Sequence, residues 1–230
     1  MKRLCIIPAR GGSKRIPRKN IKLFLGRPII AYSIQAALES ELFDEVMVST
    51  DDEEIARIAK DYGAGIPFLR SKETSGDTAT TLEVLLEILS NYEIRQRAFT
   101  DVCCIYPASP FVNPQVLTKG YNLLIERNFD CVFPVLRYGH PVQRALKVED
   151  DGRMSLSYPE YSNTRSQDLQ PTYHDAGMFY WFRPEIIRSR GSLWTDNSGC
   201  IEVSELHAQD IDNPVDWELA ELKYKYFAKR

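Results

Sequence analysis

A basic loop that directly follows an apolar strand constrains this chain more than any other feature. The run Leu4 to Ile7 predicts a short strand, and the sequence PARGGSKRIPRKN continues from Pro8 to Asn20. The adjacent Gly11 and Gly12 allow the backbone to approach a ligand closely and tolerate positive φ. The same loop carries cations that a triphosphate would neutralise, namely Arg10, Lys14, Arg15, Arg18 and Lys19. We therefore predict a loop that binds nucleotide phosphates.

Other interpretations of the loop are weaker. Its spacing does not match the Walker A pattern, and the chain contains no G-x-G-x-x-G motif for a dinucleotide. A nucleic-acid patch would spread over a face, whereas these cations are confined to one loop of a chain with formal net charge -3. The remaining alternative is a solvated charged turn. A pair of glycines placed directly after a strand favours the phosphate site over that turn.

Strand and helix signals alternate through the first two thirds of the chain. Strands are predicted at Lys2 to Pro8, Glu45 to Ser49, Val102 to Tyr106 and Cys131 to Leu136, and helices at Ile29 to Glu39, from Asp51 onward, at Thr80 to Arg97 and at Pro114 to Arg127. This alternation is typical of a doubly wound, mostly parallel α/β sheet. Ligands bind such sheets outside the carboxyl ends of the strands, which here precede Ala9, Asp51 and Pro107.

The composition fits one large α/β domain, residues 1–230, with an insert. The chain has 230 residues, of which 43% are hydrophobic, and no apolar run long enough to span a bilayer. Residues 138–171 are polar and broken by glycine and proline, and they predict an inserted hairpin unit rather than a plain loop. Five cysteines form no C-x-x-C pair, which favours buried thiols in a reducing, cytoplasmic compartment. No nucleic-acid or membrane partner is expected.

The loop sequence resembles the signature of the CMP-sialic acid synthetase family, the cytidylyltransferases that activate keto-sugar acids. The resemblance covers essentially the whole chain and includes the Asp-Ile-Asp run from Asp210 to Asp212. It implies a Rossmann-like nucleotidyltransferase fold, CTP and a 2-keto sugar acid as substrates, and CMP-sugar and pyrophosphate as products. It also implies Mg²⁺ as cofactor and a homodimer built through the insert. The amino-acid sequence of the loop most resembles that of the enzymes that act on pseudaminic acid. N-acetylneuraminic, legionaminic and 3-deoxy-manno-octulosonic acids are the alternative substrates.

The resemblance assigns residues to the nucleotide. Arg10, Lys19 and Asn20 match family positions that touch the triphosphate, and Arg10 and Lys19 are the candidates for charge stabilisation during transfer. The neighbouring Ala9, Gly11, Gly12 and Ser13 complete the predicted phosphate loop, and Arg70 and Thr81 match positions around the base and ribose. For Lys14, Arg15 and Arg18, simple solvation is an equal alternative. Asp77 or Thr78 is predicted to cap the helix that contains Leu82.

A second group of residues is predicted to bind the sugar acid. Tyr106 stands where the sialic acid enzymes typically carry glutamine, which favours a modified nine-carbon acid, although a packing role is a comparable alternative. An arginine fork is the usual holder of a carboxylate, so the insert residues Arg144 and Arg165, with Gln143 beside the first, are candidates. His174 and Asp175 begin a run, to Trp181, that resembles the pseudaminic acid enzymes and that we predict to continue as a strand. A structural hydrogen-bonding role for His174 remains open.

Asp210 and Asp212 are the metal candidates. In an extended segment, residues two apart project to the same side, so both carboxylates can share one hard cation. The alternative is a turn and cap before the helix of Trp217, a role that Asn213 and Asp216 suit better. The family resemblance then favours metal binding. A protein that only binds a nucleotide sugar would not need this pair together with Arg10 and Lys19.

Overall fold

A mostly parallel sheet forms the centre of the molecule, a computed structural model that describes residues 2–227. The strand order is β11-β6-β10-β5-β1-β4, with β9 paired to the outer half of β6. Five of these strands run in one direction, while β10 is antiparallel to both of its neighbours. The strands are β1 (Arg3–Pro8), β4 (Glu45–Ser49), β5 (Asp101–Ile105), β6 (Cys131–Arg137), β9 (Tyr173–Asp175), β10 (Phe179–Phe182) and β11 (Ser198–Glu202). The predicted fold class is confirmed.

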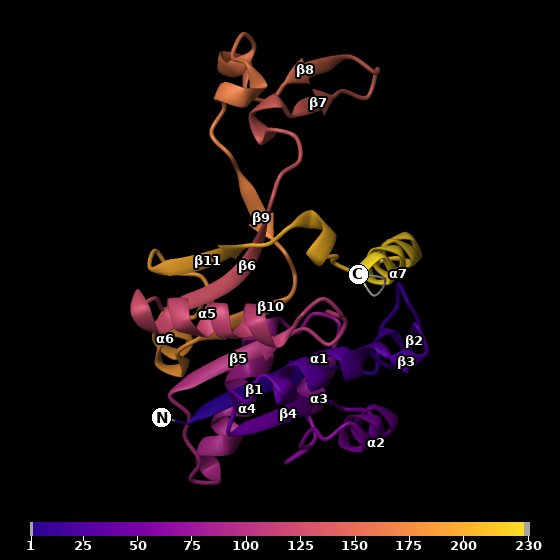
Figure 1. Cartoon of the computed structure of the whole chain (residues 1–230), viewed down its shortest axis with the longest axis vertical. Coiled ribbons are helices and arrows are strands. Elements are labelled where there is room, and N and C mark those ends of the chain that lie inside the picture. The colour runs from indigo at the N-terminus through magenta and orange to yellow at the C-terminus, as the bar shows by residue number, and fades with distance from the viewer. Residues whose placement is uncertain (1, 228–230) are drawn as a thin grey trace.

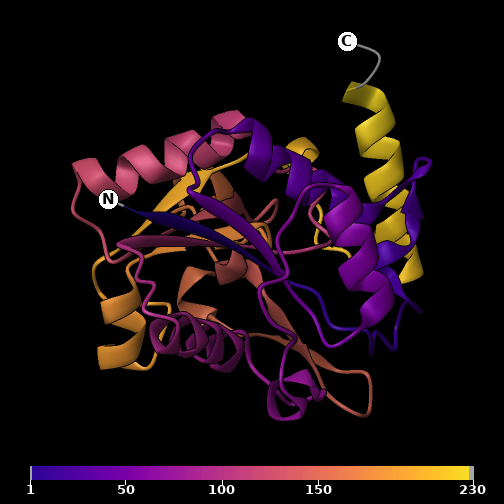
Figure 2. The ribbon, with the colours of Figure 1, turned by 90° about the horizontal axis from the view of Figure 1, so that it is seen from below.

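Helices cover both faces of the sheet (Figures 1 and 2). One face packs on α1 (Ile29–Glu39), α2 (Glu53–Asp61) and α5 (Pro114–Glu126), and the other on α4 (Thr81–Ile94) and α6 (Pro184–Arg190). Successive residues of β1 alternate between the two cores, since Cys5 and Ile7 belong to the first and Leu4 and Ile6 to the second. Burial on both faces explains why these strands are continuously apolar in sequence.

The C-terminal helix α7 (Pro214–Phe227) packs beside a small hairpin, β2 (Leu23–Phe24) and β3 (Arg27–Pro28). The rings of Trp217 and Tyr224 both meet Phe24 edge-on, at centroid distances of 5.6 Å. This contact fixes the end of the phosphate loop against the segment that precedes α7. The extended residues 208–213 are thereby brought to the loop.

The insert extends from the sheet as an arm (Figure 1). Its base is the pairing of β6 with β9, and its outer part contains the hairpin of β7 (Leu146–Val148) and β8 (Met154–Leu156). Short 3-10 turns occupy Val142–Arg144, Pro159–Tyr161 and Ser166–Asp168. A hairpin within residues 138–171 was predicted from the sequence.

Two local predictions are wrong. The cap of α4 is Thr80 rather than Asp77 or Thr78, because Thr80 forms a reciprocal capping box with Glu83. The run from His174 to Trp181 is two strands, because Gly177 has a φ of 63° and breaks the extended backbone between β9 and β10.

The expectations for thiols and membrane spans can also be compared with the structure. All five cysteines are free, and the four on β1, β5 and β6 are buried while Cys200 is exposed. Burial raises the pKa of the Cys104 thiol to about 12, so it stays protonated at neutral pH. Within residues 2–227, none of the helices combines the length and the apolar character that crossing a bilayer requires.

Candidate active site

The carboxyl ends of β1 and β4 place the phosphate loop against the start of α2. The Ala9 N–H donates to the Ser49 carbonyl at 2.8 Å, and the Gly11 N–H donates to Asp51 Oδ1 at 3.0 Å. A Cβ on Gly11 would lie 2.7 Å from Asp52 Oδ2, whereas one on Gly12 would meet nothing within 4 Å. Neither residue has positive φ. The pair therefore does not use the positive φ that glycine tolerates, and close approach to Asp52 is what demands glycine at position 11.

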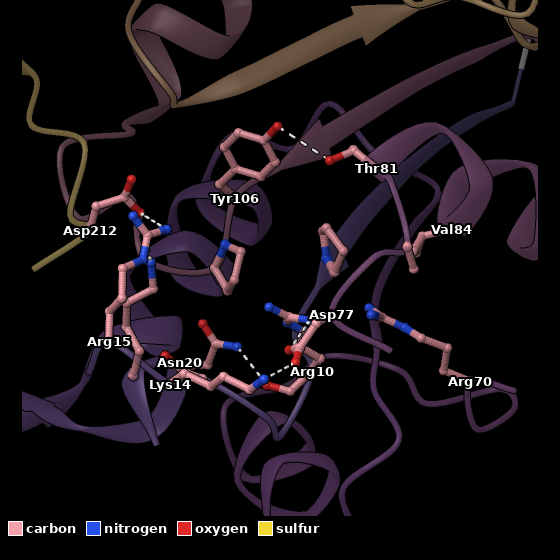
Figure 3. A pocket seen from close by; sticks show the side chains of 15 residues that line it. Arg10, Lys14, Arg15, Asn20, Arg70, Asp77, Thr81, Val84, Tyr106 and Asp212 are labelled. Atoms are coloured by element: carbon pink, nitrogen blue, oxygen red, sulfur yellow. Dashed lines mark hydrogen bonds and ion pairs between the residues drawn. The ribbon is translucent and has the colours of Figure 1, made fainter. Parts of the chain in front are cut away.

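A cavity of about 520 Å³ opens at this edge of the sheet (Figure 3). It is lined by residues from the phosphate loop, from the segment before α4, from the end of β5 and from the segment before α7. They are Pro8, Arg10, Ser13, Lys14, Arg15, Lys19, Asn20, Arg70, Asp77, Ala79, Thr81, Val84, Tyr106, Pro107 and Asp212. Eight of the residues predicted from the sequence thus line one cavity. Ala9, Gly11 and Gly12 belong to the same loop but do not line the cavity.

The loop cations that line the cavity are paired with acids across it. Arg10 Nη1 lies 3.0 Å from Asp77 Oδ1, and Lys14 forms an ion pair with the same carboxylate. Arg15 Nη2 lies 2.8 Å from Asp212 Oδ1. Figure 3 shows these pairs on two sides of the opening. Lys14 and Arg15 are therefore not simply solvated. Their side chains are exposed, but they line the cavity and form ion pairs there.

Asn20 is buried, and Lys19 is the least exposed cation of the loop. Lys19 Nζ donates to the Ile211 carbonyl at 2.7 Å and lies 3.8 Å from Asp212 Oδ1. Desolvation lowers the pKa of Lys19, an effect that the charges of Asp212 and Asp210 oppose. Asn20 Nδ2 donates to the Arg10 carbonyl at 3.0 Å. Asn20 therefore positions the backbone of Arg10, and Lys19 joins the loop to the segment before α7.

Arg70 is a buried cation at the carboxyl end of β4. Its Nη2 donates to the Ser49 carbonyl at 2.6 Å and its Nε to Ser49 Oγ at 3.1 Å. Burial lowers its pKa, while the nearby Asp51 charge acts in the opposite direction. Because two donors are already used on Ser49, the orientation of the guanidinium is fixed, and its remaining edge faces the cavity.

Arg18 has a different role from the other cations. It adopts a left-handed backbone, with φ 55°, and its guanidinium binds both Asp52 and Glu54 at the start of α2. The hydrogen bond from Arg18 lowers the pKa of Asp52, which also caps α2 by accepting from the Glu54 and Ile55 N–H groups. Neither solvation nor phosphate contact describes Arg18, which instead holds the loop to α2.

Tyr106 closes the inner end of the cavity. Its hydroxyl lies 3.4 Å from Thr81 Oγ1, and its ring meets that of Tyr180 edge-on at 5.7 Å. The Tyr180 hydroxyl in turn donates to Asp175, whose other oxygen accepts from the Gly177 N–H at 2.8 Å. Desolvation raises the pKa of Tyr106, so its phenol stays protonated. Asp175 thus acts on the cavity through Tyr180 rather than by lining it.

The two metal candidates lie side by side but face different neighbours. Asp212 lines the cavity and pairs with Arg15, whereas Asp210 packs against Gly177, where an added Cβ would come within 3.2 Å of its carboxyl carbon. Desolvation and then the charge of Asp212 raise the pKa of Asp210. Among residues 2–227, no group of three or more His, Cys, Asp or Glu side chains is arranged to hold a metal ion. A cation held here would need oxygen ligands besides these carboxylates.

The insert residues do not reach the cavity of their own chain. The Arg144 guanidinium donates to the carbonyls of Ser162 at 3.1 Å and Thr164 at 2.5 Å, and Gln143 Nε2 donates to the Gln170 carbonyl at 3.0 Å. Both residues therefore hold the arm together, and neither they nor Arg165 contribute to the cavity wall.

His174 is likewise outside the cavity. Its exposed ring packs against that of Tyr138 at a tilt of 53° with centroids 4.8 Å apart, and its Nδ1 lies 2.8 Å from the Asp175 carbonyl. Within one chain, the structural alternative therefore describes His174, and the predicted sugar-binding group is split between the cavity and the arm.

Sequence reasoning missed part of the cavity wall. Asp77 was considered only as a helix cap, and Ala79 and Val84 were not considered. An acid four residues before the start of α4, in a chain whose phosphate loop is rich in cations, was the available signal for Asp77. No local sequence signal distinguished the wall residues of α4 from ordinary core residues.

Comparison with known proteins agrees with this geometry. A sequence model described as Cytidylyltransferase matches residues 4–192. The chain belongs to the cytidylyltransferase family. The pseudaminic acid cytidylyltransferase of Campylobacter jejuni subsp. jejuni serotype O:2 is 39% identical over 225 residues, which cover 98% of this chain and 97% of that protein. N-acylneuraminate cytidylyltransferase A of Danio rerio is 36% identical over 97% of this chain and 52% of its own length.

A solved structure supports the fold. The CMP:2-keto-3-deoxy-manno-octonic acid synthetase complexed with CTP superposes with a TM-score of 0.71 at 17% identity, covering 100% of both chains. The matching family model and the C. jejuni relative confirm the family resemblance predicted from the loop, and the protein is an enzyme of the nucleotidyltransferase class.

Proposed function

We propose that this enzyme joins CTP to pseudaminic acid, releasing pyrophosphate and forming the CMP-sugar. The observation that carries the proposal is the 39% identity to the C. jejuni pseudaminic acid cytidylyltransferase, which extends over nearly the whole of both chains. The cavity supports it independently, because four cations of the phosphate loop and Arg70 converge on one opening large enough for a nucleotide.

The chemistry is an in-line displacement at the α-phosphorus. The anomeric hydroxyl oxygen of the acid forms the new P–O bond, the bond between the α-phosphorus and the bridging oxygen breaks, and the hydroxyl proton is released. Pyrophosphate leaves with additional negative charge, so catalysis consists mainly of positioning and charge stabilisation. Arg10 and Lys19 would supply that charge, Asn20 would hold the Arg10 backbone in place, and Arg70 would bind the nucleotide from a fixed orientation.

Asp210 and Asp212 would hold Mg²⁺. Their donor set fits the ion, because Mg²⁺ binds through one or two carboxylates and completes its shell with waters and phosphate oxygens. Desolvation and then the Asp212 charge raise the pKa of Asp210, and a divalent cation held here would offset both effects. When bound, the ion would neutralise phosphate charge and orient the triphosphate. Arg15 and Lys19 would then exchange Asp212 for phosphate oxygens.

The arm would form a homodimer and complete the sugar site. In the β7–β8 hairpin, Leu146 faces Leu156 and Val148 faces Met154, and alternate pairs share one face of a sheet. Val148 and Met154 are 72% and 69% exposed in the single chain. Burial of this apolar face against a second copy would bring the arm, with Arg144 and Arg165, to the partner's cavity. The buried, unpaired thiols support a reducing location such as the cytoplasm.

Pyrophosphate release tests the substrate assignment. The purified protein is incubated with Mg²⁺, each of the four nucleoside triphosphates, and pseudaminic, N-acetylneuraminic, legionaminic or 3-deoxy-manno-octulosonic acid. We expect turnover with CTP and a preference for pseudaminic acid in kcat/KM, because a mismatched acid leaves buried polar groups unpaired. A preference for another acid would overturn the assignment of pseudaminic acid as the substrate. A preference for another nucleotide would overturn the assignment of CTP.

The metal assignment has its own test. Asp212→Asn should weaken Mn²⁺ binding, measured by electron paramagnetic resonance in the presence of CTP, with the exposed Glu218→Gln as a control of equal charge change. It should also lose most of its activity at limiting Mg²⁺ while melting like the wild type. Unchanged Mn²⁺ affinity would exclude Asp212 as a ligand.

A further inference from the structure

One carboxylate lies among the cations of the phosphate loop. Asp77, on the segment between α3 (Lys72–Ser75) and α4, forms ion pairs with both Arg10 and Lys14 (Figure 3). Its side chain is 45% exposed and that of Lys14 is 80% exposed. These ion pairs with Lys14 and Arg10 lower the pKa of Asp77, so it is charged at neutral pH. An anion of the protein therefore occupies cations that a phosphate group would use.

Arg10 does not depend on this carboxylate for its position. Its Nη1 also donates to the Gly76 carbonyl at 2.9 Å, and its own carbonyl is held by Asn20 at 3.0 Å. Neither of these contacts involves the Asp77 side chain. The carboxylate is therefore the exchangeable partner of Arg10, whereas the backbone contacts are the permanent ones.

The segment that carries Asp77 is held firmly on both sides. Before it, the Ser71 hydroxyl caps α3 and contacts Glu87 of α4 at 3.0 Å. After it, Thr80 and Glu83 close the capping box of α4. Residues 76–79 alone lie between these anchors, and within residues 2–227 the Asp77 carboxylate pairs with Arg10 and Lys14. The Asp77 side chain can thus turn away while both helices and the Gly76 carbonyl stay in place.

We propose that Asp77 is a built-in anion that holds the phosphate-binding cations in the free enzyme and is displaced when the nucleotide binds. The proposal rests on the function proposed above, since it concerns the same cavity. A triphosphate carries up to four negative charges and can contact several cations at once, whereas Asp77 offers one charge. Both anions cannot share Arg10 and Lys14 without strong repulsion. Exposed ion pairs contribute little free energy, so this exchange is easy.

Removal of the Asp77 charge should therefore strengthen phosphate binding. Calorimetry with inorganic pyrophosphate, without divalent metal, isolates the phosphate part of the cavity from the base and the sugar. Asp77→Asn and Asp77→Ala should bind pyrophosphate about three- to tenfold more tightly than the wild type, as the loss of two exposed ion pairs implies. Glu73→Gln is the matched control, because it removes one charge from exposed α3 without contacting the loop cations, and its affinity should equal that of the wild type.

Each outcome of the pyrophosphate titration supports or refutes the role proposed for Asp77. Equal or weaker pyrophosphate binding by both Asp77 variants, with melting temperatures like the wild type, would overturn the proposal and indicate that Asp77 orients Arg10. An equal gain in Glu73→Gln would also overturn it, since the effect would then be general electrostatics. If the wild type and all variants fail to bind pyrophosphate, the cavity is not a phosphate site. Turnover with CTP and the acids in the wild type tests the proposed function separately, whatever Asp77 does.

Discussion

Gly11→Ala and Gly12→Ala form a matched pair that tests how the phosphate loop is held. The two residues are adjacent and both lack positive φ, so alanine is compatible with the backbone at either position. A Cβ at position 11 would lie 2.7 Å from Asp52 Oδ2 and 3.1 Å from Asp52 Cβ, while at position 12 it would meet nothing within 4 Å. Asp52 cannot simply rotate away, because it caps α2 and binds Arg18.

The magnitudes follow from these contacts. Overpacking costs about 1–3 kcal/mol, and loss of the Asp52 cap would cost about 0.5–2 kcal/mol. Alanine in place of glycine returns about 0.4–1 kcal/mol by restricting the unfolded chain. We therefore expect Gly11→Ala to lower the free energy of unfolding by about 1–2 kcal/mol, and Gly12→Ala to raise it by about 0.4–1 kcal/mol.

Urea unfolding followed by circular dichroism measures both effects. In thermal unfolding, the melting temperatures of the two variants should move in opposite directions from that of the wild type. The melting temperature of Gly11→Ala should be lower by roughly 2–8 °C for a chain of this size. Equal stability of the two variants would refute the argument that contact with Asp52 demands glycine at position 11. A Gly11→Ala variant destabilised equally in an Asp52→Gly background would also refute it, because every contacting atom of the Asp52 side chain would then be absent.

Three further predictions concern charge and assembly. Arg10→Ala should reduce kcat by roughly 10²–10³-fold, the loss expected for a preorganised charge stabiliser. Lys14→Ala should reduce kcat much less, because the Lys14 side chain is 80% exposed. Equal small effects of the two variants on pyrophosphate release would contradict this prediction. The folded-state pKa of Asp52 is lowered, so its ionised form stabilises the fold above the ordinary value of 3.8 and the benefit disappears as pH falls through the lower folded-state pKa. The difference in unfolding free energy between wild type and Asp52→Asn should therefore shrink below pH 4, and a constant difference from pH 6 to 3 would exclude the effect. Val148→Asp should shift sedimentation at micromolar concentration from dimer to monomer, whereas Ile94→Asp, at a site 76% exposed on α4, should not; a wild-type monomer would refute the dimer.

The amino-acid sequence by itself determined the parallel core of the sheet. Strands such as β5 are buried on both faces, so nearly every residue is apolar and the signal is visible without a structure. The phosphate loop was equally visible, because its glycines and cations follow directly after β1 in the chain. Asp52 and its neighbours also marked the start of α2 correctly, since helix N-termini favour acids within a few residues.

Only the tertiary structure decided which side chains meet. Asp77 and Asp212 are separated from the loop by long stretches of chain, and their pairing with Arg10, Lys14 and Arg15 depends on how α4 and α7 pack. The cap of α4 went to Thr80 because Glu83 returns its hydrogen bond, a reciprocity that a single favourable residue type does not reveal. Periodicity and composition report contacts within a few residues, whereas ion pairs across the cavity depend on distances that folding alone sets.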